Sequence, residues 1–175
     1  MTDNFDIRAL GKLAQLHKSD HIFKQGEVDR SIYFVQTGLL KAYYVTLDGK
    51  ELIKSFIQPG EFIGSLLSCD TGAPSTFYVQ CLQDTTVQRI GYDELRNIAR
   101  SNPQMNELII RSLSQLAIKK EQREYEFLCL SAPERFALLK QRQPDLVQQL
   151  TQNDIARYLG ITPVALSRIK QRGTP

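Results

Sequence analysis

The sequence has few cysteines, and their spacing does not suit a metal site or a disulfide framework. Cys69, Cys81 and Cys129 are odd in number, lie far apart and form no C-x-x-C or Cys/His cluster. Such a set predicts neither paired disulfides nor a zinc site. A cysteine-ligated iron–sulfur cluster normally needs four ligands, one more than these three provide. We therefore expect reduced thiols, no bound metal and no other cofactor.

Long apolar runs and catalytic motifs are also missing. No segment approaches the roughly 20 apolar residues of a membrane helix. The first residues, MTDNFDIRALGKL, lack the apolar core of a secretory signal. The sequence contains no P-loop, no Gly-x-Ser-x-Gly elbow and no paired-carboxylate motif. We therefore expect a folded cytoplasmic protein that is not an enzyme.

The net charge of +3 is divided unevenly along the chain. Residues 131–175 hold seven Lys and Arg against three Asp and Glu, whereas residues 1–130 hold 15 against 16. The basic excess of +4 is therefore confined to the end of the sequence, while the rest carries −1. A local basic excess is the sign expected of a surface that contacts nucleic acid.

Short segments rich in β-branched and aromatic residues fill positions 21–90. Examples are SIYFVQTG, LLKAYYVT, KELIKSFI, STFYVQCL and TTVQRI. Turn residues separate them every 8–12 residues or so, which predicts an antiparallel sandwich or barrel. Asp48-Gly49 favours a two-residue hairpin in which both residues take φ > 0. Ahead of these strands, residues 5–17 predict a short amphipathic helix, with Phe5, Leu10, Leu13 and Leu16 near one face.

A long helix is predicted over residues 103–129, with Asn102 as its N-cap and Pro103 at its first position. Its 27 residues would extend about 40 Å. Such a helix either lies along its own barrel or pairs with a second copy, and the apolar spacing favours a C2 dimer. The predicted dimer residues are Met105, Leu108, Ile109, Leu113 and Leu116. A further domain should begin near Leu130–Ser131, where Ser131 can cap a helix that ends at QRQPD.

The stretch LTQNDIARYLGITPVALSRIK satisfies the spacing of a helix-turn-helix. Gly160 lies where the turn favours φ > 0, and Ala156 lies where the two helices approach closely. Thr151 and Thr162 are each placed as N-caps, and Pro163 follows at the first helical position. The apolar positions that must pack the two helices together are Ile155, Leu159, Ile161, Leu166 and Ile169. A helical hairpin without nucleic acid is the alternative.

The second of these helices would present its first residues to base edges in the major groove. Arg168 can bind guanine through its two-pronged guanidinium, or contact phosphate instead. Pro163 and Val164 cannot hydrogen-bond a base with their side chains, although Val164 can touch a thymine methyl. The full set of predicted DNA-contacting residues is Thr151, Gln152, Thr162, Pro163, Val164, Ser167, Arg168, Lys170, Gln171 and Arg172. Of these, Thr162, Ser167, Lys170 and Arg172 suit phosphate contacts, which position the helix without specifying sequence.

The barrel segment FKQGEVDRSIYFVQTGLLKAYYVTLDGKELIKSFIQPGEFIG, the motif SAPERF and this tail together resemble the Crp/Fnr family of transcription regulators. The resemblance implies an α+β fold: a jelly-roll barrel of the cyclic-nucleotide-binding type, a dimerisation helix and an all-α helix-turn-helix domain. We place these at residues 1–101, 102–130 and 131–175. It also implies a homodimer on a palindromic double-stranded DNA site, a small-molecule effector in each barrel and RNA polymerase as a partner.

The residues that anchor cyclic AMP in this family are not matched. Ser65 stands at the position of the family's ribose-binding Glu, and Pro74 at the position of its phosphate-binding Arg. A buried phosphate without a cation would remain unpaired, so we expect that cyclic AMP is not the ligand. The predicted effector-pocket residues are Phe62, Gly64, Ser65, Leu66, Ser75 and Thr76. An uncharged ligand, a differently anchored ligand, a pocket filled by its own side chains, and ordinary strand polarity all remain open.

Other departures from the family concern its metal sites and its DNA contacts. The N-terminal region has no cysteine cluster, and His17 and His21 are expected at the surface rather than as haem ligands. Pro163 and Val164 occupy the positions of the family's base-reading Arg and Glu, and no β-hairpin wing is expected after the last helix. The tail resembles a short-tailed subgroup of the family. The alternative function is a ligand-sensing or scaffold module whose helix-turn-helix no longer binds DNA.

Overall fold

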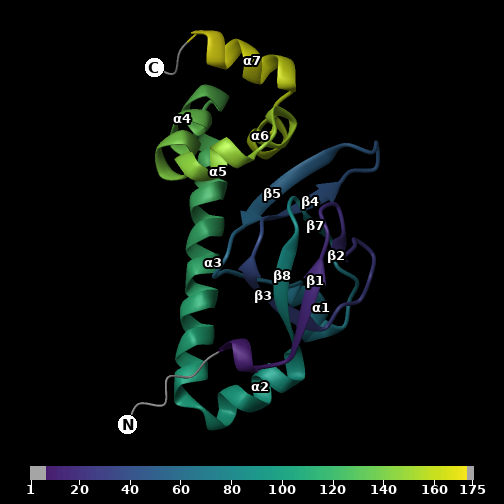
Figure 1. Ribbon diagram of the computed structural model, residues 1–175. Helices are drawn as coiled ribbons and strands as arrows, with labels where there is room; N and C mark the ends of the chain where they lie inside the picture. Colours follow the sequence, from purple (N-terminus) through teal and green to yellow (C-terminus); the bar gives the residue numbers. More distant parts are fainter. Residues whose placement is uncertain (1–6, 173–175) are drawn as a thin grey trace. The chain divides into compact units, whose positions relative to one another are not determined.

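The computed structural model describes residues 7–172, apart from the side chain of Arg8, and the chain forms two compact units (Figure 1). The first unit combines the residues up to Val45 with Lys54–Ser114. The second combines Thr46–Ile53 with the residues from Gln115 onward. The division into 1–101, 102–130 and 131–175 remains a prediction. None of the helices within residues 7–172 has the length and apolarity needed to cross a bilayer.

Two four-stranded sheets form the barrel, as the alternating segments of the sequence predict. One sheet has the order β1 (Lys12–Leu16), β8 (Thr85–Gly91), β3 (Ser31–Thr37) and β6 (Phe62–Ile63). The other has the order β2 (His21–Phe23), β7 (Tyr78–Cys81), β4 (Leu40–Val45) and β5 (Glu51–Ile57). The pairs β1–β8, β3–β8, β3–β6, β2–β7 and β4–β7 are antiparallel. The predicted jelly-roll class is therefore confirmed.

Apolar side chains from both sheets meet in one core. Val35 and Val87 from the first sheet pack with Leu40 and Val79 from the second, and none of the four is exposed. Successive residues of a strand point to opposite faces, so every second residue of these strands enters the core. These buried side chains form one apolar cluster between the two sheets.

The amphipathic helix predicted over residues 5–17 is wrong for the described part of that range. Ile7–Ala9 form a 3-10 turn, and Lys12–Leu16 form strand β1, which pairs with β8 over five residues. Gly11, at φ +65°, separates the two elements, and a Cβ there would lie 2.0 Å from the carbonyl oxygen of Arg89. Pairing with a strand some 75 residues away along the sequence outweighs the local helical pattern. Phe5 lies outside the described residues.

The hairpin between β4 and β5 also differs from the prediction. Gly49 has φ +79°, but Asp48 is not in the left-handed region. The Gly49 N–H donates to the Thr46 carbonyl at 2.9 Å, and the Thr46 N–H donates to the Lys50 carbonyl at 3.0 Å. This pattern is a type I turn followed by a left-handed glycine, the three-residue hairpin loop, rather than the two-residue loop.

Three helices complete the first part of the chain: α1 (Leu66–Thr71), α2 (Tyr92–Ser101) and α3 (Pro103–Cys129). Helix α3 has the predicted 27 residues. The Asn102 side chain accepts the Met105 N–H at 3.0 Å, which confirms its role as the N-cap. Met105 is fully buried against Ile90 and Leu95, so the start of α3 is anchored in the first unit.

Four shorter helices follow: α4 (Ala132–Arg142), α5 (Pro144–Gln149), α6 (Gln152–Leu159) and α7 (Pro163–Arg172). The break between α3 and α4 falls at the predicted position near Ser131. There the Glu134 carboxylate accepts the Ser131 backbone N–H at 2.7 Å. Helix α5 begins at Pro144, which cannot continue the preceding helix. These helices belong to the second unit and include the predicted helix-turn-helix.

Candidate nucleic-acid interface

Helices α6 and α7 form the helix-turn-helix predicted by the spacing. Gly160 ends α6 at φ +70°, and the Ile161 N–H donates to the Ala156 carbonyl at 3.0 Å. The Thr151 hydroxyl accepts the Asp154 N–H at 3.1 Å, and the Thr162 hydroxyl accepts the Ala165 N–H at 3.2 Å. Both predicted N-caps and the left-handed glycine are therefore present.

The apolar residues predicted to pack these two helices together are buried or half-buried in the structure. Ile155, Leu159 and Leu166 are buried, and Ala156 has no exposed surface. The other two predicted apolar positions, Ile161 and Ile169, are half-buried. A small residue at 156 lets α6 lie close to its neighbours, and the apolar residues hold α7 at a set angle to α6.

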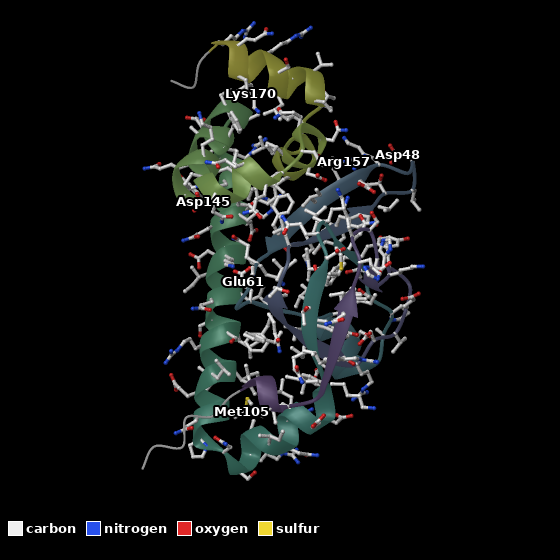
Figure 2. The ribbon with its side chains drawn as sticks, in the orientation of Figure 1. Asp48, Glu61, Met105, Asp145, Arg157 and Lys170 are labelled. Atoms are coloured by element: carbon white, nitrogen blue, oxygen red, sulfur yellow. The ribbon has the colours of Figure 1, made fainter. Side chains whose placement is uncertain are left out.

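The outward side of this pair is polar and basic. All ten residues predicted to contact DNA are exposed: Thr151, Gln152, Thr162, Pro163, Val164, Ser167, Arg168, Lys170, Gln171 and Arg172. Helix α7 contains three basic residues and no acidic one. Lys170 (labelled in Figure 2) also lies over the Phe136 ring, with Nζ 5.6 Å from the centroid. The predicted residues are therefore accessible to solvent, and their contact with DNA remains a prediction.

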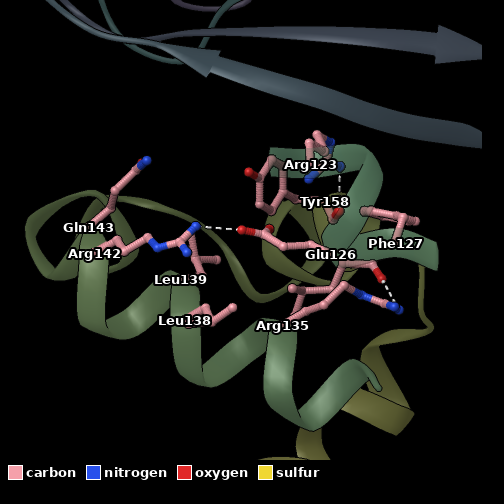
Figure 3. A pocket seen from close by; sticks show the side chains of 10 residues that line it. Arg123, Glu126, Phe127, Arg135, Leu138, Leu139, Arg142, Gln143 and Tyr158 are labelled. Carbon is pink, nitrogen blue, oxygen red and sulfur yellow. Dashed lines mark hydrogen bonds and ion pairs between the residues drawn. The ribbon is translucent and has the colours of Figure 1, made fainter. Parts of the chain in front are cut away.

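Two arginines from other helices hold the end of α6. Arg123 of α3 donates to the Tyr158 carbonyl at 2.8 Å, and Arg135 of α4 donates to the Leu159 carbonyl at 3.1 Å (Figure 3). These carbonyls belong to the last turn, where a helix has unsatisfied acceptors and a partial negative charge. The guanidiniums therefore stabilise α6 and fix the point from which the turn to α7 starts.

Local sequence patterns did not predict the structural role of either arginine. Arg123 interrupts the apolar stripe of α3, and that interruption is the signal that could have identified it. Burial lowers the pKa of its guanidinium, an effect that Tyr158 and Glu126 oppose. The same arginine donates to the Ile53 carbonyl at 2.9 Å, and Arg157 of α6 pairs with Glu51. The hairpin segment Thr46–Ile53 therefore belongs with these helices.

The predicted dimer residues of α3 fall into two groups. Met105 is buried, and Leu108 and Ile109 are half-buried against the same cluster, so these three pack within the first unit. Leu113 and Leu116 are 46% and 40% exposed. Of the five predicted dimer residues, Leu113 and Leu116 are therefore the exposed ones, and the dimer itself remains a prediction.

The predicted effector-pocket residues lie around α1 and the start of β7. Ser65 and Ser75 are buried, Phe62 and Gly64 are half-buried, and Leu66 and Thr76 are exposed. The Ser65 hydroxyl accepts the Ser68 N–H at 3.3 Å and caps α1. The Ser75 hydroxyl donates to the Phe77 carbonyl at 2.9 Å. Both serines therefore satisfy their own backbone rather than facing a ligand as unpaired groups.

The histidines take different positions. His17 is exposed, as predicted, whereas His21 is half-buried, and its Nε2 lies 2.9 Å from the Tyr43 hydroxyl. Burial lowers the pKa of His21. Within the part of the chain that the structure describes, no three His, Cys, Asp or Glu side chains are grouped as a metal site would require.

Comparison with known proteins agrees with this arrangement. Residues 13–102 match the family model of the cyclic nucleotide-binding domain. The chain is 31% identical over 169 residues to the "Anaerobic regulatory protein" of Haemophilus influenzae, covering 90% of this chain and 65% of that one. It is 30% identical over 184 residues to the "Transcriptional activator protein Anr" of Pseudomonas protegens, covering 95% and 74%.

Solved structures agree on the fold. FixK2 from Bradyrhizobium japonicum superposes with a TM-score of 0.80 at 20% identity, covering 93% of this chain and 84% of that one. The chain spans less than two thirds of the length of the Haemophilus relative. A matching domain model over more than half of the chain and relatives of this identity establish the family. The chain belongs to the Crp/Fnr family of transcription regulators, with a cyclic nucleotide-binding domain at residues 13–102.

Proposed function

We propose that the protein is a homodimeric, sequence-specific DNA-binding transcription regulator. The observation that supports this most directly is the exposed basic face of α7 on a helix-turn-helix whose two caps and turn glycine are in place. Helix α7 carries Arg168, Lys170 and Arg172 without an acidic neighbour in the same helix. A surface of this sign attracts the phosphate backbone, and its helix has the dimensions of the major groove.

The residues of α7 have distinct roles in this proposal. Arg168 binds a guanine edge through both prongs of its guanidinium. Lys170 and Arg172, in the last turn, contact phosphate and set the register of the helix on the duplex. Val164, which is 62% exposed, lies in the first turn and meets a thymine methyl. Thr151 and Gln152 bring the N-terminus of α6 to a phosphate.

The dimer forms through the exposed part of α3 that includes Leu113 and Leu116. Two such helices bury these side chains against each other and present two copies of α7 to a palindromic site. The barrel does not bind cyclic AMP, because Pro74 stands where the family has its phosphate-binding Arg and because Ser65 and Ser75 are engaged with backbone groups. An effector of other chemistry and RNA polymerase are its further partners. The protein acts without catalysis and resides with the chromosome in the cytoplasm.

The experiment is a selection of binding duplexes from a random-sequence library, followed by fluorescence anisotropy with a selected duplex. Six basic residues from two copies of α7 predict a slope of about −5 in log affinity against log salt. Arg168→Ala should lower specific affinity about tenfold and relax the preference at one base pair of each half-site, since a bidentate contact contributes about 1–3 kcal/mol of discrimination.

Arg111→Ala is the matched control, because Arg111 is an exposed arginine of α3 that pairs with Glu107 in the preceding turn of the same helix. It should leave the affinity unchanged. Cyclic AMP added to the same titration should not move the midpoint. Failure to select any duplex, or affinity independent of salt, would reject the proposal in favour of a ligand-sensing or scaffold module.

A further inference from the structure

A small pocket of about 40 Å³ lies among α3, α4 and α6 in the second unit, apart from the exposed face of α7 (Figure 3). We call it the arginine pocket. Its charged lining comes from Arg123, Glu126, Arg135 and Arg142, and the rings of Phe127 and Tyr158 form part of its wall. The DNA contacts proposed above use none of these side chains.

The charges of the arginine pocket are unbalanced. Three guanidiniums share it with one carboxylate, Glu126, which already pairs with Arg142 at 2.5 Å. Arg123 and Arg135 lie against the Phe127 ring, each 4.6 Å from its centroid. Within residues 7–172, both guanidiniums donate to backbone carbonyls, Arg123 also interacts with the Tyr158 side chain, and neither donates to a carboxylate. The pocket therefore holds an excess of two positive charges.

One donor in this cluster is also unused. Nε of Arg135 is buried, and among the described residues no atom accepts a hydrogen bond from it. The two terminal nitrogens of the same guanidinium donate to the Leu130 and Leu159 carbonyls, so they hold the group in place. A buried, fixed and unsatisfied donor beside unbalanced cations is a group that requires an acceptor.

We propose that the arginine pocket binds a small inorganic oxyanion, with phosphate as the representative ligand. An oxyanion supplies the missing acceptor and the missing negative charge together, and guanidinium is the side chain best shaped to bind it. The volume holds about three water molecules, which admits an ion of this size. It is far below the several hundred Å³ of a typical pocket for a larger organic ligand or a nucleotide.

Binding there has a structural consequence for the helix-turn-helix. Arg123 and Arg135 also donate to the Tyr158 and Leu159 carbonyls at the end of α6. An anion between these arginines reduces the repulsion between the two guanidiniums that hold this helix end. The bound ion therefore stabilises the second unit.

The first test measures thermal unfolding of the full chain in sodium phosphate, sodium chloride and sodium gluconate at equal ionic strength. Gluconate is too large for the pocket and serves as the reference. Phosphate should raise the melting temperature with a saturable dependence on its concentration. Equal melting temperatures in phosphate and gluconate overturn the proposal, and so does a rise in chloride as large as the rise in phosphate.

The second test measures phosphate binding directly by equilibrium dialysis. Arg135→Lys keeps the charge but removes Nε, and it should weaken binding at least tenfold. Glu126→Gln removes the competing carboxylate and should tighten binding several-fold, a change that a misfolded variant could not imitate. Arg168→Ala should bind phosphate like the parent, because that residue lies on the DNA face. Unchanged binding in Arg135→Lys, or lost binding in Arg168→Ala, assigns the ion elsewhere and overturns the proposal.

Discussion

Replacing Gly160 with alanine tests how the turn of the helix-turn-helix is built. Gly160 has φ +70°, and an added Cβ would lie 3.0 Å from Cε1 of Phe127. An alanine in the left-handed conformation costs about 1 kcal/mol. The Phe127 ring must also move away from two guanidiniums that lie 4.6 Å from its centroid, which costs about a further 1 kcal/mol. We therefore expect Gly160→Ala to lower the free energy of unfolding by about 2 kcal/mol.

Gly49→Ala is the matched control for the share of this loss in unfolding free energy that comes from the left-handed backbone conformation. Gly49 has φ +79° and belongs to the same compact unit, but an added Cβ would meet nothing within 4 Å. It should cost only about 1 kcal/mol. Urea unfolding followed by circular dichroism at 222 nm measures both. With a slope of about 2 kcal/mol per M, the midpoint should fall by about 1 M for Gly160→Ala and by half as much for Gly49→Ala.

The two contributions can be separated further with Phe127→Ala as a background. Without the ring, Gly160→Ala should cost no more than Gly49→Ala, because only the backbone conformation remains. If Gly160→Ala is no more destabilising than Gly49→Ala in the parent, the contact with Phe127 has no energetic role. If neither variant loses stability, an alanine in the left-handed conformation has no measurable cost at these positions, and that part of the reasoning is also refuted.

Two further predictions concern exposed and buried side chains. Leu113→Glu places a charge on the exposed part of α3 and should convert the dimer to a monomer in sedimentation velocity. The control Leu47→Glu, at the exposed hairpin tip, should leave the dimer intact. A dimeric Leu113→Glu protein would contradict the proposed interface. At pH 8 a thiol reagent should modify only Cys129 in the folded protein, because Cys69 and Cys81 are buried and burial raises the pKa of the Cys69 thiol to about 11. All three thiols should react in guanidinium chloride, and fast reaction of a second thiol in native buffer would disprove the burial.

The sequence predicts those parts of the fold that depend on interactions between residues close together along the chain. Helix α3 begins at the predicted cap because Asn102 reaches a backbone N–H only three residues away. The turn between α6 and α7 forms as predicted because Gly160, Thr151 and Thr162 act on groups within a few residues. The ten residues predicted to contact DNA are likewise exposed, because helical periodicity decides which side of a helix faces solvent.

Other features depended on partners far away along the chain. Residues 12–16 form a strand because they pair with strand β8, and the local residue pattern does not indicate that partner. Arg123 and Arg135 bind carbonyls that lie 35 and 24 residues further along the chain, and no local pattern indicates those partners. The Asp48-Gly49 loop took three residues instead of two, although both loops suit a glycine.

The sequence by itself determined the antiparallel sandwich or barrel, the long helix and the helix-turn-helix, because periodicity, caps and turn glycines act over a few residues. The tertiary structure alone decided where the first strand pairs, which part of α3 is exposed, and how three arginines come together around one carboxylate. These outcomes arise from burial and hydrogen bonding between segments far apart along the chain. Such contacts stabilise the protein only after folding has brought the segments together.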